Sequence, residues 1–103
     1  MDKIGKKTIQ IQAKGAGRLS EDLVIAEQFR YAVDKRKKKI TLLPLKPDEH
    51  ANGNSARVWQ NPRNKCGYIA MAKMLHQAGV RWEKILHQTL QVKRRGDAIE
   101  IQL

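Results

Sequence analysis

The sequence predicts a small α+β domain in which two strand-loop-helix-hairpin repeats form a pseudo-twofold, β-barrel-like unit. The length of 103 residues suits one compact domain. Polar and apolar residues alternate at both ends of the chain, as in Thr8–Gln12, which is typical of half-buried strands. The same order of patterns also occurs twice. Neither half can cover its own apolar face, so we expect the halves to pack together.

The first repeat covers residues 1–45. Ser20 is a favourable N-cap, with acids in the turn after it, and Leu23, Ala26 and Phe29 form a helical stripe. In order, we expect a strand at 8–12, a glycine loop at 14–18, a helix from 20 to about 30, and a hairpin with strands at 31–33 and 40–43 around a charged turn at 34–39.

Residues 46–55 are rich in Pro, Asp, Asn, Gly and Ser, which predicts a linker. The second repeat covers residues 56–103. In order, we expect a strand at 56–60, a polar turn at 61–65, a short segment at 67–69 leading into a helix at 70–77, an extra segment near 80–87, a strand at 90–92, a basic turn at 93–97 and a last strand at 98–103.

Several short motifs correspond between the two halves. Gly17-Arg18-Leu19 matches Gly67-Tyr68-Ile69, while Ile40 and Leu42 match Ile99 and Ile101; the basic run at 35–39 likewise matches the one at 93–95. An internal duplication explains these matches. Chance resemblance between short units of strand and helix is the alternative.

Positive charge dominates the composition. Lys and Arg number 21 and Asp and Glu 10, which gives a formal net charge of +11. Such self-repulsion is usually tolerated because a polyanionic partner neutralises it, and nucleic acid is the commonest such partner. A basic surface that only aids solubility is the alternative.

Three groups of basic residues are candidates for nucleic-acid binding. Consecutive cations at a hairpin turn can reach phosphates, and an arginine beside a glycine loop can contact phosphate or guanine with two parallel hydrogen bonds. The candidates are Lys35, Arg36, Lys37, Lys38 and Lys39 in the first charged turn; Lys93, Arg94 and Arg95 in the second; and Lys14, Arg18, Arg57 and Arg63 near the loops. A solvated charged turn, or a nuclear-targeting stretch in a eukaryote, is the alternative for 35–39.

We expect no catalytic residue, metal or cofactor. The single cysteine, Cys66, allows no internal disulfide and is expected to be a small buried hydrophobe, while the three histidines are scattered. Trp59 and Tyr31 are expected in the core, and Trp82 at the surface. The N-terminus lacks the apolar core of a signal peptide, so we expect a cytoplasmic protein, nucleoid-associated in a bacterium and without a membrane partner.

The order strand, Gly-Arg loop, short helix and hairpin resembles the AbrB and MazE family of transition-state regulators and antitoxins. The likeness is carried by 9–11, Gly17-Arg18-Leu19 and 40–44, and is echoed in the second half, where Tyr68 stands in the place of the arginine. In that family, two short chains interlock their hairpins into one small DNA-binding barrel. The resemblance implies that this chain is similar to a fused dimer.

These observations predict a nucleic-acid-binding protein, with DNA expected rather than RNA. We expect a DNA-binding regulator or a mobile-element accessory factor that contacts phosphates through its basic hairpin turns. The alternatives are a binder of single strands or structured RNA, a phage- or plasmid-encoded inhibitor or adaptor that engages a protein, and a small basic RNase toxin of the RelE type. A homodimer or a protein partner stays open.

Overall fold

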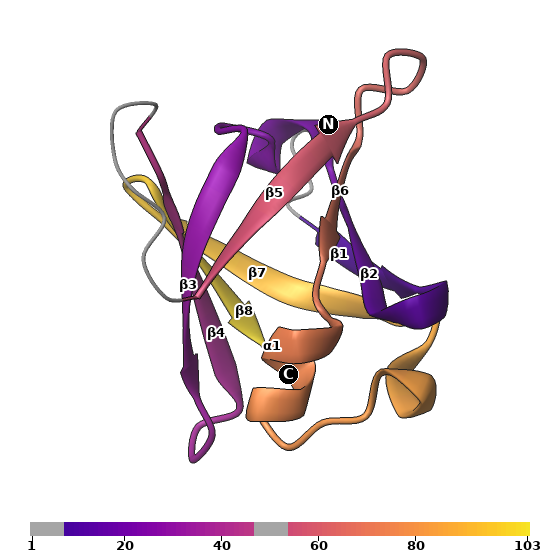
Figure 1. Ribbon diagram of the computed structural model, residues 1–103, viewed down its shortest axis with the longest axis vertical. Helices are drawn as coiled ribbons and strands as arrows, with labels where there is room; N and C mark the ends of the chain where they lie inside the picture. The colour runs from indigo at the N-terminus through magenta and orange to yellow at the C-terminus, as the bar shows by residue number, and fades with distance from the viewer. Residues whose placement is uncertain (1–7, 47–53) are drawn as a thin grey trace, which may run out of the picture.

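Eight antiparallel strands close into a barrel in the computed structural model of the chain, which describes residues 8–46 and 54–103 (Figure 1). The strands are β1 (Thr8–Gln12), β2 (Ala16–Leu19), β3 (Gln28–Asp34), β4 (Lys39–Pro44), β5 (Ser55–Gln60), β6 (Gly67–Ala70), β7 (Thr89–Arg95) and β8 (Ala98–Gln102). Their order around the barrel is β1-β2-β6-β5-β3-β4-β8-β7, and β7 pairs back with β1. Each of these strands is therefore paired on both sides, which confirms the predicted barrel.

The core lies inside the barrel and follows from the period-two patterns. In β1, β4 and β8 every second residue is an aliphatic side chain that points inward. Ile9, Ile40, Leu42, Ile99 and Ile101 are fully buried as a result. The predicted strand at 8–12 and the predicted hairpin partner at 40–43 are both confirmed.

The strand order has an internal symmetry. The order around the closed barrel stays the same when each strand is exchanged with its counterpart in the other half: β1 with β5, β2 with β6, β3 with β7 and β4 with β8. On the paired strands β2 and β6, Arg18 lies opposite Tyr68, while Gly17 faces Ile69 and Leu19 faces Gly67. The same relation holds on β4 and β8, where Ile40 pairs with Ile101 and Leu42 with Ile99.

The predicted helix over 20–30 is wrong. Only a 3-10 helix forms at Glu21–Leu23, and the side chain of Ser20 makes no capping hydrogen bond. The Ser20 hydroxyl instead accepts the backbone N–H of Thr8 at 3.1 Å. Phe29 belongs to β3, where it is fully buried on the inward side that Tyr31 shares. The period-two pattern of this segment and its pairing with β4 prevail over the helical stripe.

The glycine loop is shorter than predicted. A 3-10 helix at Ala13–Gly15 joins β1 to β2, with Lys14 and Gly15 at positive φ. Residues 16–18, predicted as loop, belong to β2. The second basic turn also differs, since 93–95 are the last residues of β7 and only 96–97 form the turn.

The second half carries the longest helix of the described chain, α1 (Ala72–Gln77), inside the predicted range 70–77. Met74 and Leu75 of α1 are fully buried against the core. Figure 1 shows α1 at the lower end of the barrel. The extra segment forms a 3-10 helix at Trp82–Ile85. The halves are thus mainly strand, and the predicted α+β repeats are not confirmed. The linker predicted at 46–55 lies outside the described residues, apart from its ends at 46 and 54–55.

Candidate nucleic-acid interface

One wall of the barrel has an outer surface that combines aromatic and basic side chains. It consists of the outward residues of β1, β2, β6 and β5, which are neighbours in the sheet, and we call it the aromatic face. A single row crosses the four strands, because Gln10 pairs with Arg18, Arg18 with Tyr68, and Tyr68 with Trp59. Four side chains that are far apart in the sequence are thus brought side by side.

Trp59 is the most prominent member of this row. Its side chain is 61% exposed, whereas its neighbour Val58 packs against the core. The Trp59 and Tyr68 rings lie 5.8 Å apart between centroids and are tilted by 40°. The core position predicted for Trp59 is therefore wrong, and so is the exposed position predicted for Trp82, which is half-buried against the core. Tyr31 is buried as predicted.

Arg18 points out of the barrel because both of its neighbours on β2 point in. A Cβ atom on Gly17, next to Arg18, would come within 2.3 Å of the Met71 sulfur, so a larger residue there would force the Met71 side chain to move. The Arg18 Nη2 donates to the Cys66 Sγ at 3.6 Å. That hydrogen bond, followed by the electrostatic effects of Cys66 and Tyr68, raises the pKa of Arg18. Like any arginine, it is a permanent cation.

The aromatic face carries no acidic residue. Within strands β1, β2, β6 and β5 the only charged side chains are Arg18 and Arg57, and Arg57 shares the outward side of β5 with Trp59. The β1–β2 turn contributes Lys14 and the β5–β6 turn Arg63, both exposed. Because β2 and β6 are antiparallel, these turns lie at opposite ends of the face. A polyanion on this wall would meet cations in the middle of the face and at both of its ends.

The opposite wall is different in character. We call the outward side chains of β3, β4, β8 and β7 the ion-pair face. Glu100 accepts from the Lys39 Nζ at 3.0 Å, and its other oxygen lies 3.6 Å from the Arg95 Nε. These residues and Lys93 line a hollow of about 260 Å³. The Lys39 hydrogen bond, and then the charges of Arg95, Lys39 and Lys93, lower the pKa of Glu100 against the opposing effect of burial.

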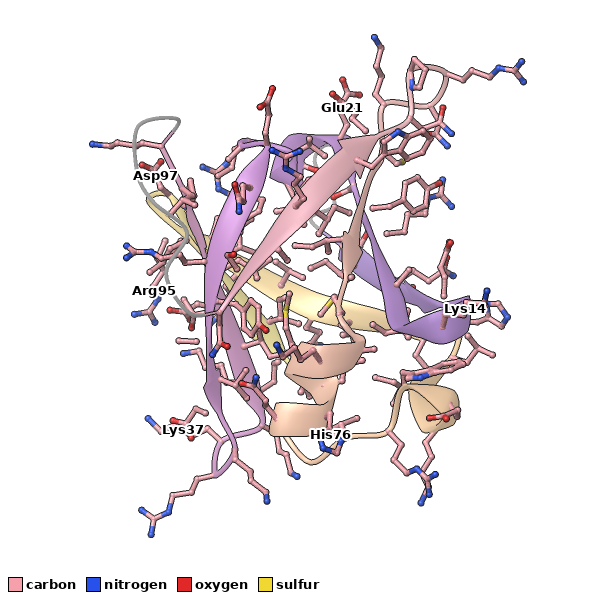
Figure 2. All side chains as sticks on the ribbon, viewed as in Figure 1. Lys14, Glu21, Lys37, His76, Arg95 and Asp97 are labelled. Atoms are coloured by element: carbon pink, nitrogen blue, oxygen red, sulfur yellow. The ribbon has the colours of Figure 1, made fainter. Side chains whose placement is uncertain are left out.

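The two predicted basic turns do not converge. Lys39, next to the β3–β4 turn, pairs with Gln102. Gln102 ends β8, whereas the β7–β8 turn lies at the start of β8, so the two turns lie at opposite ends of the wall. Figure 2 shows Lys37 at the lower left, Arg95 higher on the left and Lys14 on the right. The predicted site residues therefore divide into two sets: Arg18 and Arg57 lie on the aromatic face with Lys14 and Arg63 in the turns at its ends, and the others lie around the ion-pair face.

Several cations of the predicted turns already have structural contacts. The Lys38 Nζ donates to the Ala78 carbonyl at 3.0 Å, where a cation stabilises the C-terminal end of α1. Lys39 is held by Glu100. Arg94 lies on the inward side of β7, and its Nη2 donates to the Gly96 carbonyl at 3.0 Å. Lys35, Arg36 and Lys37 remain exposed as predicted.

Replacing Glu100 by Gln is expected to lower the melting temperature near neutral pH. Because the folded state has the lower Glu100 pKa, its stabilisation is present above the unfolded value of about 4.3 and is lost as the pH falls through the folded value. The difference in melting temperature between wild type and Glu100→Gln should therefore shrink between about pH 7 and about pH 3. Glu83→Gln, at an exposed position, is the control. An unchanged difference across that range would contradict the ion-pair assignment.

The described residues contain no group of three His, Cys, Asp or Glu side chains that could hold a metal ion. Cys66 is half-buried rather than buried, and its recorded partner is Arg18 rather than a histidine. His76 lies exposed on α1, at the bottom of Figure 2, and His50 is outside the described residues. In the described ranges, no helix has the length and apolar content needed to cross a membrane.

Comparison with protein-family models, curated proteins and solved structures finds no match to this chain. The likeness to the AbrB and MazE family therefore stays a prediction based on the motifs around Arg18.

Proposed function

We propose that this protein binds nucleic acid through the aromatic face, with the role of a DNA-binding regulator or accessory factor. The observation that carries the proposal is a barrel wall on which Arg18, Arg57 and the exposed Trp59 lie together without any acidic side chain. Such a wall attracts phosphates, and its ring offers contact area to bases or sugars.

The charge pattern favours this wall over the predicted turns. Arginine can bind phosphate through two parallel hydrogen bonds, and the strands that carry Arg18 and Arg57 contain no acid; Glu27, just before β3, lines the same hollow as Arg57. On the ion-pair face, Lys39 and Arg95 must first leave Glu100. Binding there would lose part of the electrostatic gain. The turn at 35–38 is therefore expected to add long-range attraction more than direct contacts.

Binding is expected to weaken steeply with salt. Lys65 is a further exposed cation between β5 and β6. If Lys14, Arg18, Arg57, Arg63 and Lys65 each neutralise one phosphate, affinity should fall about 100- to 500-fold between about 50 and 200 mM monovalent salt, with the lower value for single strands. Fluorescence anisotropy of a labelled oligonucleotide at several salt concentrations measures how steeply the logarithm of the affinity falls with the logarithm of the salt concentration. A slope near zero, or no association even at the lowest salt, would overturn the proposed function.

A further inference from the structure

Trp59 is unusually exposed for a side chain of its size. Among the described residues, three large hydrophobic side chains are exposed, and Trp59, at 61%, exceeds Leu43 at 39% and Ile25 at 36%. The pleat of β5 holds the indole on the solvent side, because Val58 takes the inward position. An exposed indole beside a second aromatic ring offers apolar contact area to a ligand.

Tyr68 packs beside this ring. It lies directly across from Trp59 on β6, and the two rings are 5.8 Å apart between centroids. Both side chains grow from strands that are paired on either side in a closed barrel. A ring that already packs beside a neighbour has less conformational freedom to lose, so a ligand that stacks on Trp59 is expected to cost less entropy than one that stacks on an isolated ring.

Arg18 continues the row on the next strand. It lies two strand spacings from Trp59, a distance of roughly 10 Å. Its planar guanidinium can stack on a base or bind a phosphate with two hydrogen bonds. Gln10, paired with Arg18 on β1, adds an amide donor and acceptor at the end of the row.

We propose that the aromatic face takes an unpaired nucleic-acid strand, with one base stacked on the Trp59 indole and the adjoining part of the strand held at Arg18. This inference rests on the proposed function and adds the class of ligand to it. The strand would cross β5, β6, β2 and β1 along the row. Arg57, on the same side of β5 as Trp59, would take a phosphate beside the stacked base.

The geometry favours unpaired bases over a duplex. In a duplex the flat faces of the bases are stacked on one another, and only their edges are open in the grooves. The Trp59 ring on a barrel wall can offer stacking only to a base whose face is free. A duplex could use the cations of the face but would gain nothing from the Trp59–Tyr68 pair.

The test compares three ligands of equal length: an oligothymidylate, a strand of abasic nucleotides with the same number of phosphates, and a duplex. The chain has two tryptophans, so Trp82→Phe leaves Trp59 as the fluorescent reporter. We expect oligothymidylate, but not the abasic strand, to quench this fluorescence. We also expect it to bind tighter than either of the other ligands.

The key variant is Trp59→Ala. It should weaken oligothymidylate binding by about 5- to 150-fold, the range seen for the loss of one stacked base, and leave binding of the abasic strand unchanged. Trp59→Phe should recover most of the affinity. Leu43→Ala removes another exposed apolar side chain, on the opposite wall, and should change neither affinity.

The outcomes separate the two proposals. Equal binding of the oligothymidylate and the abasic strand, or a duplex that binds tighter regardless of Trp59, would overturn the unpaired-strand assignment and leave the proposed function standing. If none of the three ligands binds, the proposed function itself fails. Loss of binding to all ligands in Trp59→Ala, with an unchanged melting temperature, would also contradict stacking as the role of Trp59.

Discussion

Reversing the charge of Arg18 and Arg57 together should weaken nucleic-acid binding by about 100-fold or more, because hydrogen bonds to charged groups contribute about 1.5 to 3 kcal/mol each. Both side chains point outward from the aromatic face, and the strands of that face contain no other charge. The plot of the logarithm of the binding constant against the logarithm of the salt concentration should also become shallower, its slope falling in magnitude by roughly one to two. Anisotropy titrations of Arg18→Glu/Arg57→Glu at several salt concentrations measure both quantities.

A matched variant separates position from net charge. Arg36→Glu/Lys37→Glu changes the formal charge by the same amount, at two exposed positions of the β3–β4 turn. We expect it to lose much less affinity, since only the long-range field is reduced. Equal losses in the two double variants would show that net charge alone holds the ligand. A larger loss in the turn variant would return the site to the basic turn predicted from the sequence.

Replacing Gly15 by Ala should destabilise the fold by about 2 to 5 kcal/mol, the sum of a left-handed backbone penalty and the cost of overpacking. Gly15 is buried at φ +78, and a Cβ atom there would lie 2.7 Å from the Ala72 Cβ and 3.0 Å from the Ala72 Cα. To relieve this overlap, the start of α1 would have to move away from Gly15. The hydrogen bond that the Met71 N–H donates to the Gly15 carbonyl at 2.9 Å opposes that movement. Urea or thermal unfolding followed by circular dichroism measures the loss.

Gly96→Ala is the control for that substitution. Gly96 also has a positive φ, +59, but a Cβ atom there meets nothing within 4 Å. Only the backbone penalty of about 1 to 2 kcal/mol should remain. If the two variants lose the same stability, the contact between Gly15 and Ala72 contributes nothing and the β1–β2 turn does not depend on α1.

Strands with a consistent alternation were predictable, and the segment after Ser20 was not. Thr8–Gln12 alternates through its whole length, and its strand was predicted correctly. After Ser20, Leu23 and Phe29 fit a helical stripe, yet Phe29 also begins the alternation with Tyr31 that β3 follows. Local spacing cannot decide between these periods, because the choice depends on pairing with β4 and β5, which are distant in the sequence.

The candidate site was only partly predictable for a similar reason. Arg18 stood out beside its glycine, but Trp59 was expected in the core. A usable signal existed in β5, since Arg57 and Trp59 share one side of the strand while Ala56 and Val58 share the other. A charged residue two positions before Trp59 marks its side as the solvent side. How far apart the two basic turns lie could not be foreseen, since it depends on the antiparallel pairing of β4 with β8.

The symmetry between the two halves has a consequence for which side chains can occupy equivalent positions. In a barrel assembled from two identical chains, every substitution appears twice, so positions that face each other across the twofold must carry the same side chain. Here one chain encodes both places separately, and a guanidinium at Arg18 can stand opposite a phenol at Tyr68. The row thus runs from the rings of Trp59 and Tyr68 to the guanidinium of Arg18 and the amide of Gln10, and a ligand that lies along it meets a surface with a direction.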